Sequence, residues 1–223
     1  MSTELGAPAD QAASAAISPP PSGAAIATIA GRQLLVALRL LIAMTIVLGI
    51  GYPLVVLGVG QLIAPNAANG SLLTVDGRAV GSSLIGQEFD GDQWFAGRPS
   101  AAGDGYDALS SGGSNLSADS PELLELIEQR RADIAAANGV DAARVPAEAV
   151  TASASGLDPH ISPEYALLQV NRVADARGLP ADQVHDLVES HIQGAALGFI
   201  GQERVNVLEL NLALEQLSAS GGG

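Results

Sequence analysis

One segment limits what the rest of the chain can become: residues 40–60 contain no formal charge. A helix over these 21 residues would be about 30 Å long, because each residue adds about 1.5 Å, and this matches the hydrocarbon core of a bilayer. We therefore expect a transmembrane helix over residues 34–62. Pro53 should kink it, which membrane helices tolerate better than soluble ones.

Two alternatives to a membrane anchor stay open. A signal peptide could be cleaved near Ala64, but such peptides usually have a short leading region and an apolar stretch of about 7–15 residues. Here the uncharged run is longer and 39 residues precede it. A buried helix of a soluble protein is the other alternative, and the scarcity of polar residues in the run argues against it.

The charges that flank the run predict its orientation. Arg32 and Arg39 stand on the N-terminal side, whereas the first twenty residues on the other side carry only Asp76 and Arg78. Arginine and lysine collect on the cytoplasmic side of membrane proteins. We therefore expect a single-pass protein of the cell (inner) membrane, with a cytoplasmic N-terminus and an extracytoplasmic soluble domain.

Composition excludes several classes of function. The chain has 223 residues and a formal net charge of −14, and its ten basic residues are all arginine. Nucleic-acid binding depends on clustered positive charge, so we expect no nucleic-acid partner. The chain has no cysteine, which excludes disulfides, thiolate metal sites and cysteine nucleophiles.

The remaining segments divide by composition. Residues 1–33 are rich in Ala, Pro, Ser and Gly and predict a disordered cytoplasmic tail, with an Ala-rich helical extension of the next segment as the alternative. Residues 63–217 predict one extracytoplasmic domain of the α+β class, with mixed helices and strands. Residues 218–223 predict a flexible tail.

Local signals predict the elements of this domain. Asp76-Gly77 lies between two apolar runs and suits a type I′ hairpin turn. Helices are expected after the caps Ser120 and Ser162, each followed by proline and glutamate, with stops at Gly139 and Gly178. A third helix begins at Pro180. Residues 205–217 alternate like a strand but also fit a helix, which we favour, capped by Asn206.

The three histidines suggest no metal site. His185 and His191 are six residues apart on an expected helix, so they cannot share an ion. His191 lies on the apolar face and is interpreted as a hydrogen-bonded core residue. His160 follows Asp158 in a loop before a helix, where a catalytic pair is conceivable, although no G-x-S-x-G nucleophile motif accompanies it.

A polar glycine-rich loop runs through residues 109–115 (LSSGGSN). Consecutive backbone N–H groups in such a loop can bind an anion, but no lysine follows, so it is not a P-loop. It is faintly similar to the LSGGQ motif of ABC transporters. A tight structural turn is the alternative interpretation and the one we favour.

Several strings are more specific together than any one alone. They are residues 94–101 (WFAGRPSA), 111–116 (SGGSNL), 151–163 (TASASGLDPHISP), and 198–201 (GFIG) followed by 204–211 (RVNVLELN). In this order, behind one membrane helix, they resemble the KdpC family, the C subunit of the Kdp potassium-transporting ATPase. The resemblance covers roughly residues 34–217.

The resemblance implies a function that composition does not. Kdp is an ATP-driven potassium uptake pump with a channel-like potassium-conducting subunit, an ATP-hydrolysing P-type subunit and a small fourth subunit. The C subunit is expected to be non-catalytic, to assemble and stabilise the complex, and to act as a catalytic chaperone that raises the ATPase subunit's affinity for ATP. ATP and potassium are handled by the complex, and we expect no cofactor or metal on this chain. The nucleotide contact proposed for the family carries over to Ser111, Gly112, Gly113, Ser114 and Asn115.

That nucleotide contact conflicts with the predicted orientation, because ATP is cytoplasmic. We favour the orientation, and with it a cap over the outer mouth of the ion-conducting subunit. The expected docking residues are Trp94, Arg98, Asp158 and His160, since tryptophan and arginine dominate interface hot spots; an internal ion pair is the alternative for Arg98. A membrane-anchored solute-binding module and a hydrolase using Asp158 and His160 remain the alternative functions.

Overall fold

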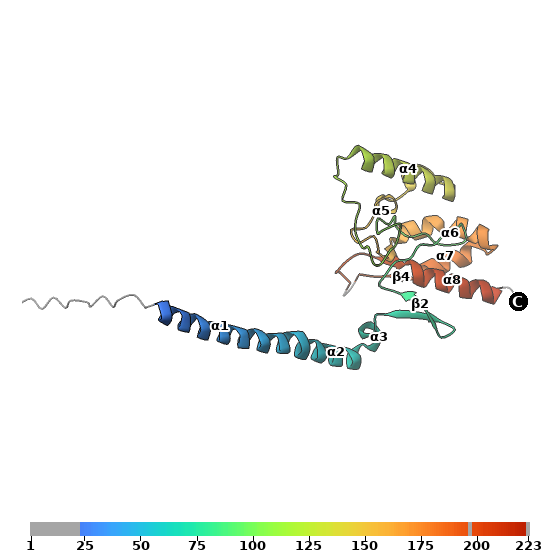
Figure 1. Cartoon of the computed structure of the whole chain (residues 1–223). Helices are drawn as coiled ribbons and strands as arrows, with labels where there is room; N and C mark the ends of the chain where they lie inside the picture. Colours follow the sequence, from blue (N-terminus) through green and yellow to red (C-terminus); the bar gives the residue numbers. More distant parts are fainter. Residues whose placement is uncertain (1–22, 196–197, 222–223) are drawn as a thin grey trace, which may run out of the picture. The chain divides into compact units, whose positions relative to one another are not determined.

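The computed structural model describes residues 23–195 and 198–221. The chain forms two compact units, Met1–Gly60 and Gln61–Gly223, and each is described by itself. The predicted fold class is confirmed in its coarse form: helices and strands are mixed, and one long apolar helix lies near the N-terminus (Figure 1).

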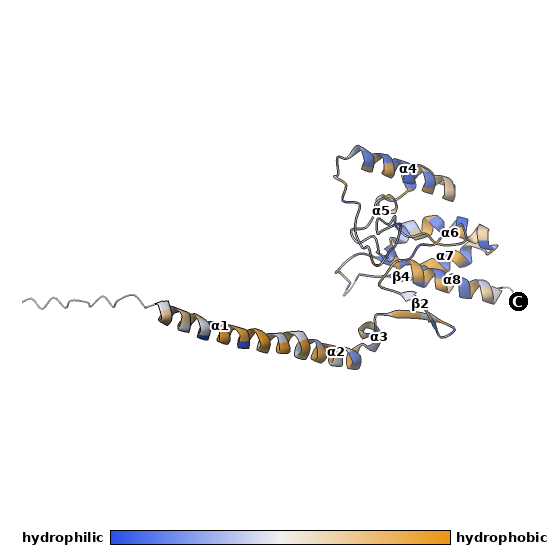
Figure 2. Cartoon of the chain, viewed as in Figure 1, coloured by the Kyte–Doolittle hydropathy of each residue, from blue (hydrophilic) through white to orange (hydrophobic). Residues whose placement is uncertain are grey.

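From residue 23 onward the N-terminal unit is one helical rod. It comprises α1 (Gly23–Ile46), a π-helical turn η1 (Val47–Gly51) and α2 (Tyr52–Ile63), the end of which belongs to the second unit. Residues Ala27–Ile63 are long and apolar enough to cross a membrane, and none of the most apolar window is buried inside the chain. Figure 2 shows hydrophobic residues along most of this rod.

The rod starts earlier than expected. Residues 23–33, which the sequence assigned to the disordered tail, are helical, so the Ala-rich extension is the correct interpretation for them. Elongating an existing helix costs far less than nucleating a new one, and alanine is the best helix former. Residues 1–22 of the predicted tail lie outside the described residues.

The irregularity expected at Pro53 occurs just before it, as a π-helical turn. Tyr52 N–H donates to the carbonyl of Val47, five residues earlier. Proline has no N–H and its ring clashes with the carbonyl four residues before it. Widening the preceding turn relieves this clash, and such π-turns are a known source of helix distortion.

The second unit opens with α3 (Pro65–Ala68) and a hairpin of β1 (Leu72–Val75) and β2 (Arg78–Ser82). Asp76 and Gly77 both have positive φ, 50° and 74°, as a type I′ turn requires. The pairing register shifts between Leu73 and Thr74. The hairpin prediction is therefore confirmed, with one irregularity that the sequence did not indicate.

Helix α4 (Pro121–Asn138) begins after Ser120 and ends at Gly139, whose φ is 60°. The end signals are confirmed, although the Ser120 side chain makes no capping hydrogen bond. The expected apolar face is the less exposed one, but only Ala135 of this helix is fully buried. Two short helical turns follow, η2 (Ala142–Arg144) and α5 (Ala147–Val150).

Helices α6 (Pro163–Arg177) and α7 (Ala181–Ser190) form the best-packed pair. The Ser162 hydroxyl accepts a hydrogen bond from Tyr165 N–H, as its capping role predicts, and Gly178 ends α6 with φ 64°. The face expected for α6 is buried, as are Val184 and Val188 of α7.

A small antiparallel sheet orders its strands β3-β5-β4, where β3 is His160–Ile161, β4 is Ile192–Gln193 and β5 is Arg204–Asn206. Helix α8 (Val207–Gly221) follows β5 directly. Asn206 Oδ1 accepts from Glu209 N–H at 3.1 Å, so the predicted helix and its cap are confirmed. The helix continues through most of residues 218–223, where a flexible tail was predicted, because Ser218 is held by Leu214 and Arg177.

One hydrophobic core lies among α6, α7, α8 and the small sheet. Its largest fully buried side chains come from all of these elements and from the loop before α4. They include Phe95, Ile161, Val173, Val184, Val188, Val205, Leu210 and Leu214. The core therefore joins the irregular first half of the domain to its helical second half.

Candidate functional site

Three of the four predicted docking residues meet in one cluster. Arg98 Nη1 lies 3.1 Å from Asp158 Oδ2, and its Nε and Nη2 donate to the carbonyl of Thr151 at 3.4 and 3.2 Å. His160 Nδ1 lies 3.3 Å from the other carboxylate oxygen of Asp158, and His160 N–H donates to that oxygen at 3.1 Å. The internal ion pair considered for Arg98 is therefore present.

The cluster keeps its carboxylate ionised. The hydrogen bond from the His160 side chain, opposed by partial burial and supported by Arg98, holds the pKa of Asp158 below its usual range. A general base acts best when its pKa is near the working pH. Asp158 is thus a paired charge, and its geometry favours recognition over proton abstraction.

Tyr106 holds the backbone of Arg98 in place through a hydrogen bond. Tyr106 donates its hydroxyl to the carbonyl of Arg98 at 2.7 Å, and its N–H donates to Ser100 Oγ at 2.8 Å. Burial is the main cause that raises the pKa of Tyr106 to about 12. A β-carbon at Gly97 would lie 2.5 Å from the tyrosine oxygen, so glycine is required for this approach.

A cavity of about 320 Å³ opens beside the cluster. Its lining includes Arg98, Asp158 and His160 together with residues at the start of β5 and just before it. The latter are Gln202, Glu203 and Arg204. Apart from Ile161 the lining residues are charged or polar, which suits contact with another polar surface better than an apolar small molecule.

The glycine-serine loop is occupied by contacts within the domain. Gly112 N–H donates to the carbonyl of Ser155 at 2.9 Å, and Ser111 Oγ donates to the same oxygen at 2.9 Å. A β-carbon at Gly113 would lie 3.2 Å from the carbonyl of Ala154. Ser114 and Asn115 are exposed. The loop thus packs along residues 153–156, as the structural-turn interpretation predicts.

Trp94 is not beside Arg98 in the contacts of the described residues. Its ring lies 4.3 Å from the guanidinium carbon of Arg177, a cation–π contact, and 5.7 Å from the ring of Phe89. Arg177 also donates to the carbonyl of Gln93 and pairs with Glu215. Trp94 therefore contacts the C-terminal end of α6, and Trp94 and Arg98 belong to two separate features.

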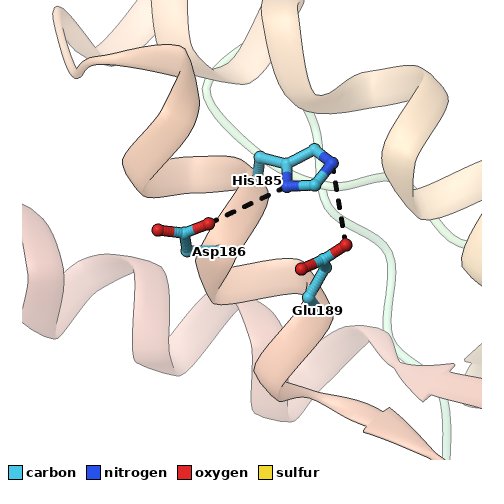
Figure 3. A group of neighbouring side chains, drawn as sticks. All are labelled: His185, Asp186 and Glu189. Carbon is cyan, nitrogen blue, oxygen red and sulfur yellow. Dashed lines mark ion pairs between the residues drawn. The ribbon is translucent and has the colours of Figure 1, made fainter.

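The remaining histidines lie away from the cluster. His191 is only partly buried, just after α7, so its predicted place in the core was wrong. The predicted hydrogen bond is confirmed, because its Nδ1 lies within hydrogen-bonding distance of the Leu187 carbonyl. Figure 3 shows His185 between Asp186 and Glu189, each with an oxygen 3.9 Å from a ring nitrogen. All three side chains are exposed, and exposed acidic groups of this kind are common on helices, so we assign no metal there.

Sequence reasoning missed two buried amides that hold the site's loop. Asn211 exchanges hydrogen bonds with both backbone groups of Phe95, at 2.9 Å each. Gln169 does the same for Ala96, at 2.8 and 3.2 Å. One signal for them existed: each is a polar residue inside an apolar helical stripe, and buried polar groups need partners.

Comparison with known proteins identifies the family. A family model described as the K+-transporting ATPase c chain, KdpC, matches residues 34–216. The chain is 57% identical over 183 residues to a protein of Kineococcus radiotolerans, covering 82% of this chain and 93% of that protein. It is 48% identical to a protein of Streptomyces coelicolor, covering 88% and 97%. It is 50% identical to a protein of Mycobacterium tuberculosis, covering 83% and 99%.

All three relatives carry the name potassium-transporting ATPase KdpC subunit. The match of the family model runs from within the apolar rod to residue 216, inside α8, so it includes residues of both structural units. The matched residues include the Arg98 cluster, the glycine-serine loop and the sheet. The chain belongs to the KdpC family and is a subunit of the Kdp K+-transporting ATPase.

Proposed function

We propose that this chain is a non-catalytic, membrane-anchored subunit that assembles and stabilises the potassium pump from outside the cytoplasm. Its domain docks on the outer face of the potassium-conducting, channel-like subunit. The ATP-hydrolysing P-type subunit and a small fourth subunit complete the complex. The observation that carries the proposal is the apolar rod, whose most apolar window has no cover inside the chain and therefore needs lipid or partner helices around it.

Charge supports the orientation. Arg32 and Arg39 lie toward the N-terminal end of the apolar helix, and the domain beyond it, residues 61–223, carries eight arginines against 22 acidic residues. Positive residues stay in the cytoplasm during insertion. An acidic domain outside the membrane also raises the local concentration of cations, an effect that salt screens beyond about 8–10 Å.

Contacts at the glycine-serine loop favour docking over a nucleotide site. A phosphate-binding loop needs backbone N–H groups that are free to face the anion. Gly112 N–H is already committed to the Ser155 carbonyl, and Gly113 lies against the backbone of Ala154. The alternative role, a chaperone that raises the ATP affinity of the ATPase subunit by touching nucleotide at this loop, would require these contacts to break.

Single cysteines test the orientation, because the chain has none of its own. Ser22→Cys lies ahead of α1, and Leu109→Cys replaces a side chain that is 99% exposed. A membrane-impermeant thiol reagent on intact cells should label position 109 and spare position 22, and permeabilised cells should label both. The reverse pattern in intact cells would place the domain in the cytoplasm and overturn the proposal.

Co-purification tests assembly. The full chain, tagged at its C-terminus and extracted from membranes of potassium-starved cells, should bring down the other pump subunits. Deleting its gene should lower the amount of assembled pump. If the remaining subunits assembled and transported normally without this chain, an anchored solute-binding module or hydrolase would become the better interpretation. Loss of an activity on His160→Ala, with assembly intact, would favour the hydrolase.

A further inference from the structure

The connection between β4 and β5 presents two large apolar side chains to solvent. Phe199 is 77% exposed and Ile200 is 52% exposed. Both lie between Gly198 and Gly201, whose φ angles of 81° and 92° are values that other residues adopt with difficulty. Glycines with positive φ therefore flank a pair of large apolar residues, which are more often found in the interior of a protein.

The base of this connection is fixed by the sheet. Gln193 of β4 pairs with Arg204 of β5, and Ile192 pairs with Val205, which is fully buried. Gln193 also donates to Glu209 of α8 at 3.1 Å. The apolar pair is therefore carried by a strand pair that belongs to the core.

The same connection borders the Arg98 cluster. Its C-terminal limb, Gln202 to Arg204, lines the cavity of about 320 Å³ that Arg98, Asp158 and His160 also line. An apolar tip next to a polar, charged hollow matches the anatomy of a protein interface, in which a few apolar anchors lie beside polar contacts.

The charge of the domain and the small exposed area of Phe199 and Ile200, the apolar tip, indicate which kind of surface covers them. A lipid surface is disfavoured because the domain carries a large excess of acidic residues and bacterial membranes present anionic head groups. A second copy of the chain is disfavoured because two side chains offer at most about 300 Å², whereas each partner in a stable pair buries about 800 Å². A tip this small adds specificity to a complex that other parts of the chain already hold together.

We propose that Phe199 and Ile200 form a hot-spot anchor that inserts into an apolar pocket on the potassium-conducting subunit of the pump, beside a polar contact made by the Arg98 cluster. This rests on the proposed function, which it deepens by naming the surface that docks. The pocket that receives the anchor should be apolar at its floor, and the partner surface that faces the adjoining cavity should carry no net negative charge, because Glu203, Glu148 and Asp158 line that cavity.

Photo-crosslinking in assembled membranes tests the occupant. A photoreactive phenylalanine analogue at position 199 of the full chain should crosslink to the potassium-conducting subunit upon illumination. The same analogue at Leu109, which is 99% exposed, is the matched control and should not. Crosslinking of position 199 to lipid, to a second copy of this chain, or to nothing would overturn the inference.

A substitution at Phe199 tests how much this side chain contributes to the affinity. Phe199→Ser should lower the affinity of the chain for the other subunits about 10- to 30-fold, as loss of an interface hot spot does, while Leu109→Ser leaves it unchanged. Both side chains are exposed, so both variants should keep the thermal unfolding of the starting chain. If the starting chain assembles but Phe199→Ser assembles equally well, the anchor is wrong and the proposed function stands. If the starting chain itself brings down no pump subunit, the proposed function fails first.

Discussion

Arg98 and Asp158 join two segments that are sixty residues apart in the sequence, with 3.1 Å between guanidinium nitrogen and carboxylate oxygen. The same guanidinium holds the Thr151 carbonyl. Both side chains of the ion pair are mostly shielded, with 21% and 31% exposed. The pair is therefore part of the domain's framework as well as of the face that we propose to dock.

Replacing this arginine should weaken both framework and assembly. Arg98→Ala removes the donor to Asp158 Oδ2 and to the Thr151 carbonyl, while His160 still bonds Asp158 Oδ1. The loss should cost about 1–2 kcal/mol and lower the melting temperature by several degrees. Differential scanning calorimetry of the detergent-solubilised chain measures this. Arg144→Ala removes an exposed arginine and is the control, with a change within about 0.5 kcal/mol. Equal melting temperatures for the two variants would show that the pair contributes nothing.

The two glycines of the glycine-serine loop should respond differently to alanine. A β-carbon at Gly112 meets nothing within 4 Å, whereas one at Gly113 lies 3.2 Å from the Ala154 carbonyl. Gly112→Ala should therefore be nearly neutral, and Gly113→Ala should cost about 1 kcal/mol through crowding. The ATP concentration for half-maximal hydrolysis by the pump should be unchanged in both. A severalfold rise for either variant, with assembly intact, would favour the chaperone account.

Gly156 should be the least replaceable glycine of this region. Its φ is 66°, and a β-carbon would lie 2.7 Å from the Ala102 nitrogen and 2.8 Å from the Gly112 carbonyl. Gly156→Ala should cost more than about 2 kcal/mol and lower the amount of folded chain. Gly178→Ala is the matched control: φ is 64°, but nothing lies within 4 Å, so only the backbone penalty of about 1 kcal/mol remains. Similar losses for both variants would contradict the packing argument.

Alkaline pH should lower the stability of the domain because its buried tyrosines ionise. The chain has no lysine that would titrate in the same pH range. Burial raises the pKa of Tyr165 to about 12, from about 10 in an unfolded chain. The folded state therefore holds its proton more tightly, and stability present below pH 10 falls as pH rises toward 12, by about 2–3 kcal/mol for this group.

Tyr165→Phe should remove that part of the pH dependence without lowering stability at pH 7. The hydrogen bonds that Tyr165 makes in the described part of the chain use its backbone. Tyr106→Phe should differ, because it also loses the bond to the Arg98 carbonyl and is destabilised at neutral pH. Chemical denaturation at pH 7, 10 and 12 separates the two. An unchanged alkaline slope in Tyr165→Phe would show that this hydroxyl is not shielded from ionisation.

Sequence reasoning succeeded where the cause of structure is local. Asp76-Gly77, Ser162 and Gly178 specify their turn, cap and stop through their own backbone preferences, and each was predicted. Strands β3 and β4 were missed because two-residue strands leave no periodic pattern. They exist only because β5 lies between them.

In the candidate site, too, contacts between sequence neighbours were predicted and contacts between distant residues were not. The Asp158–His160 pair was foreseen because the two residues are neighbours in sequence, and the structure adds Arg98 as a third member. The contact of Trp94 was not predicted, because Arg177 reaches it from α6 and nothing in the nearby sequence indicates that contact. The docking role of these residues stays a prediction.

The paired amides of Gln169 and Asn211 have a consequence for the order of folding. Asn211 bonds a residue 116 positions earlier, and Gln169 one 73 positions earlier. The chain is synthesised from its N-terminus, so the backbone N–H and carbonyl of Phe95 cannot bond Asn211 until α8 has been made. Contacts so distant in sequence also form slowly. The first half of the domain therefore lacks these hydrogen-bond partners while the second half is synthesised. A truncation that removes Asn211 from α8 would leave the backbone groups of Phe95 without their partner.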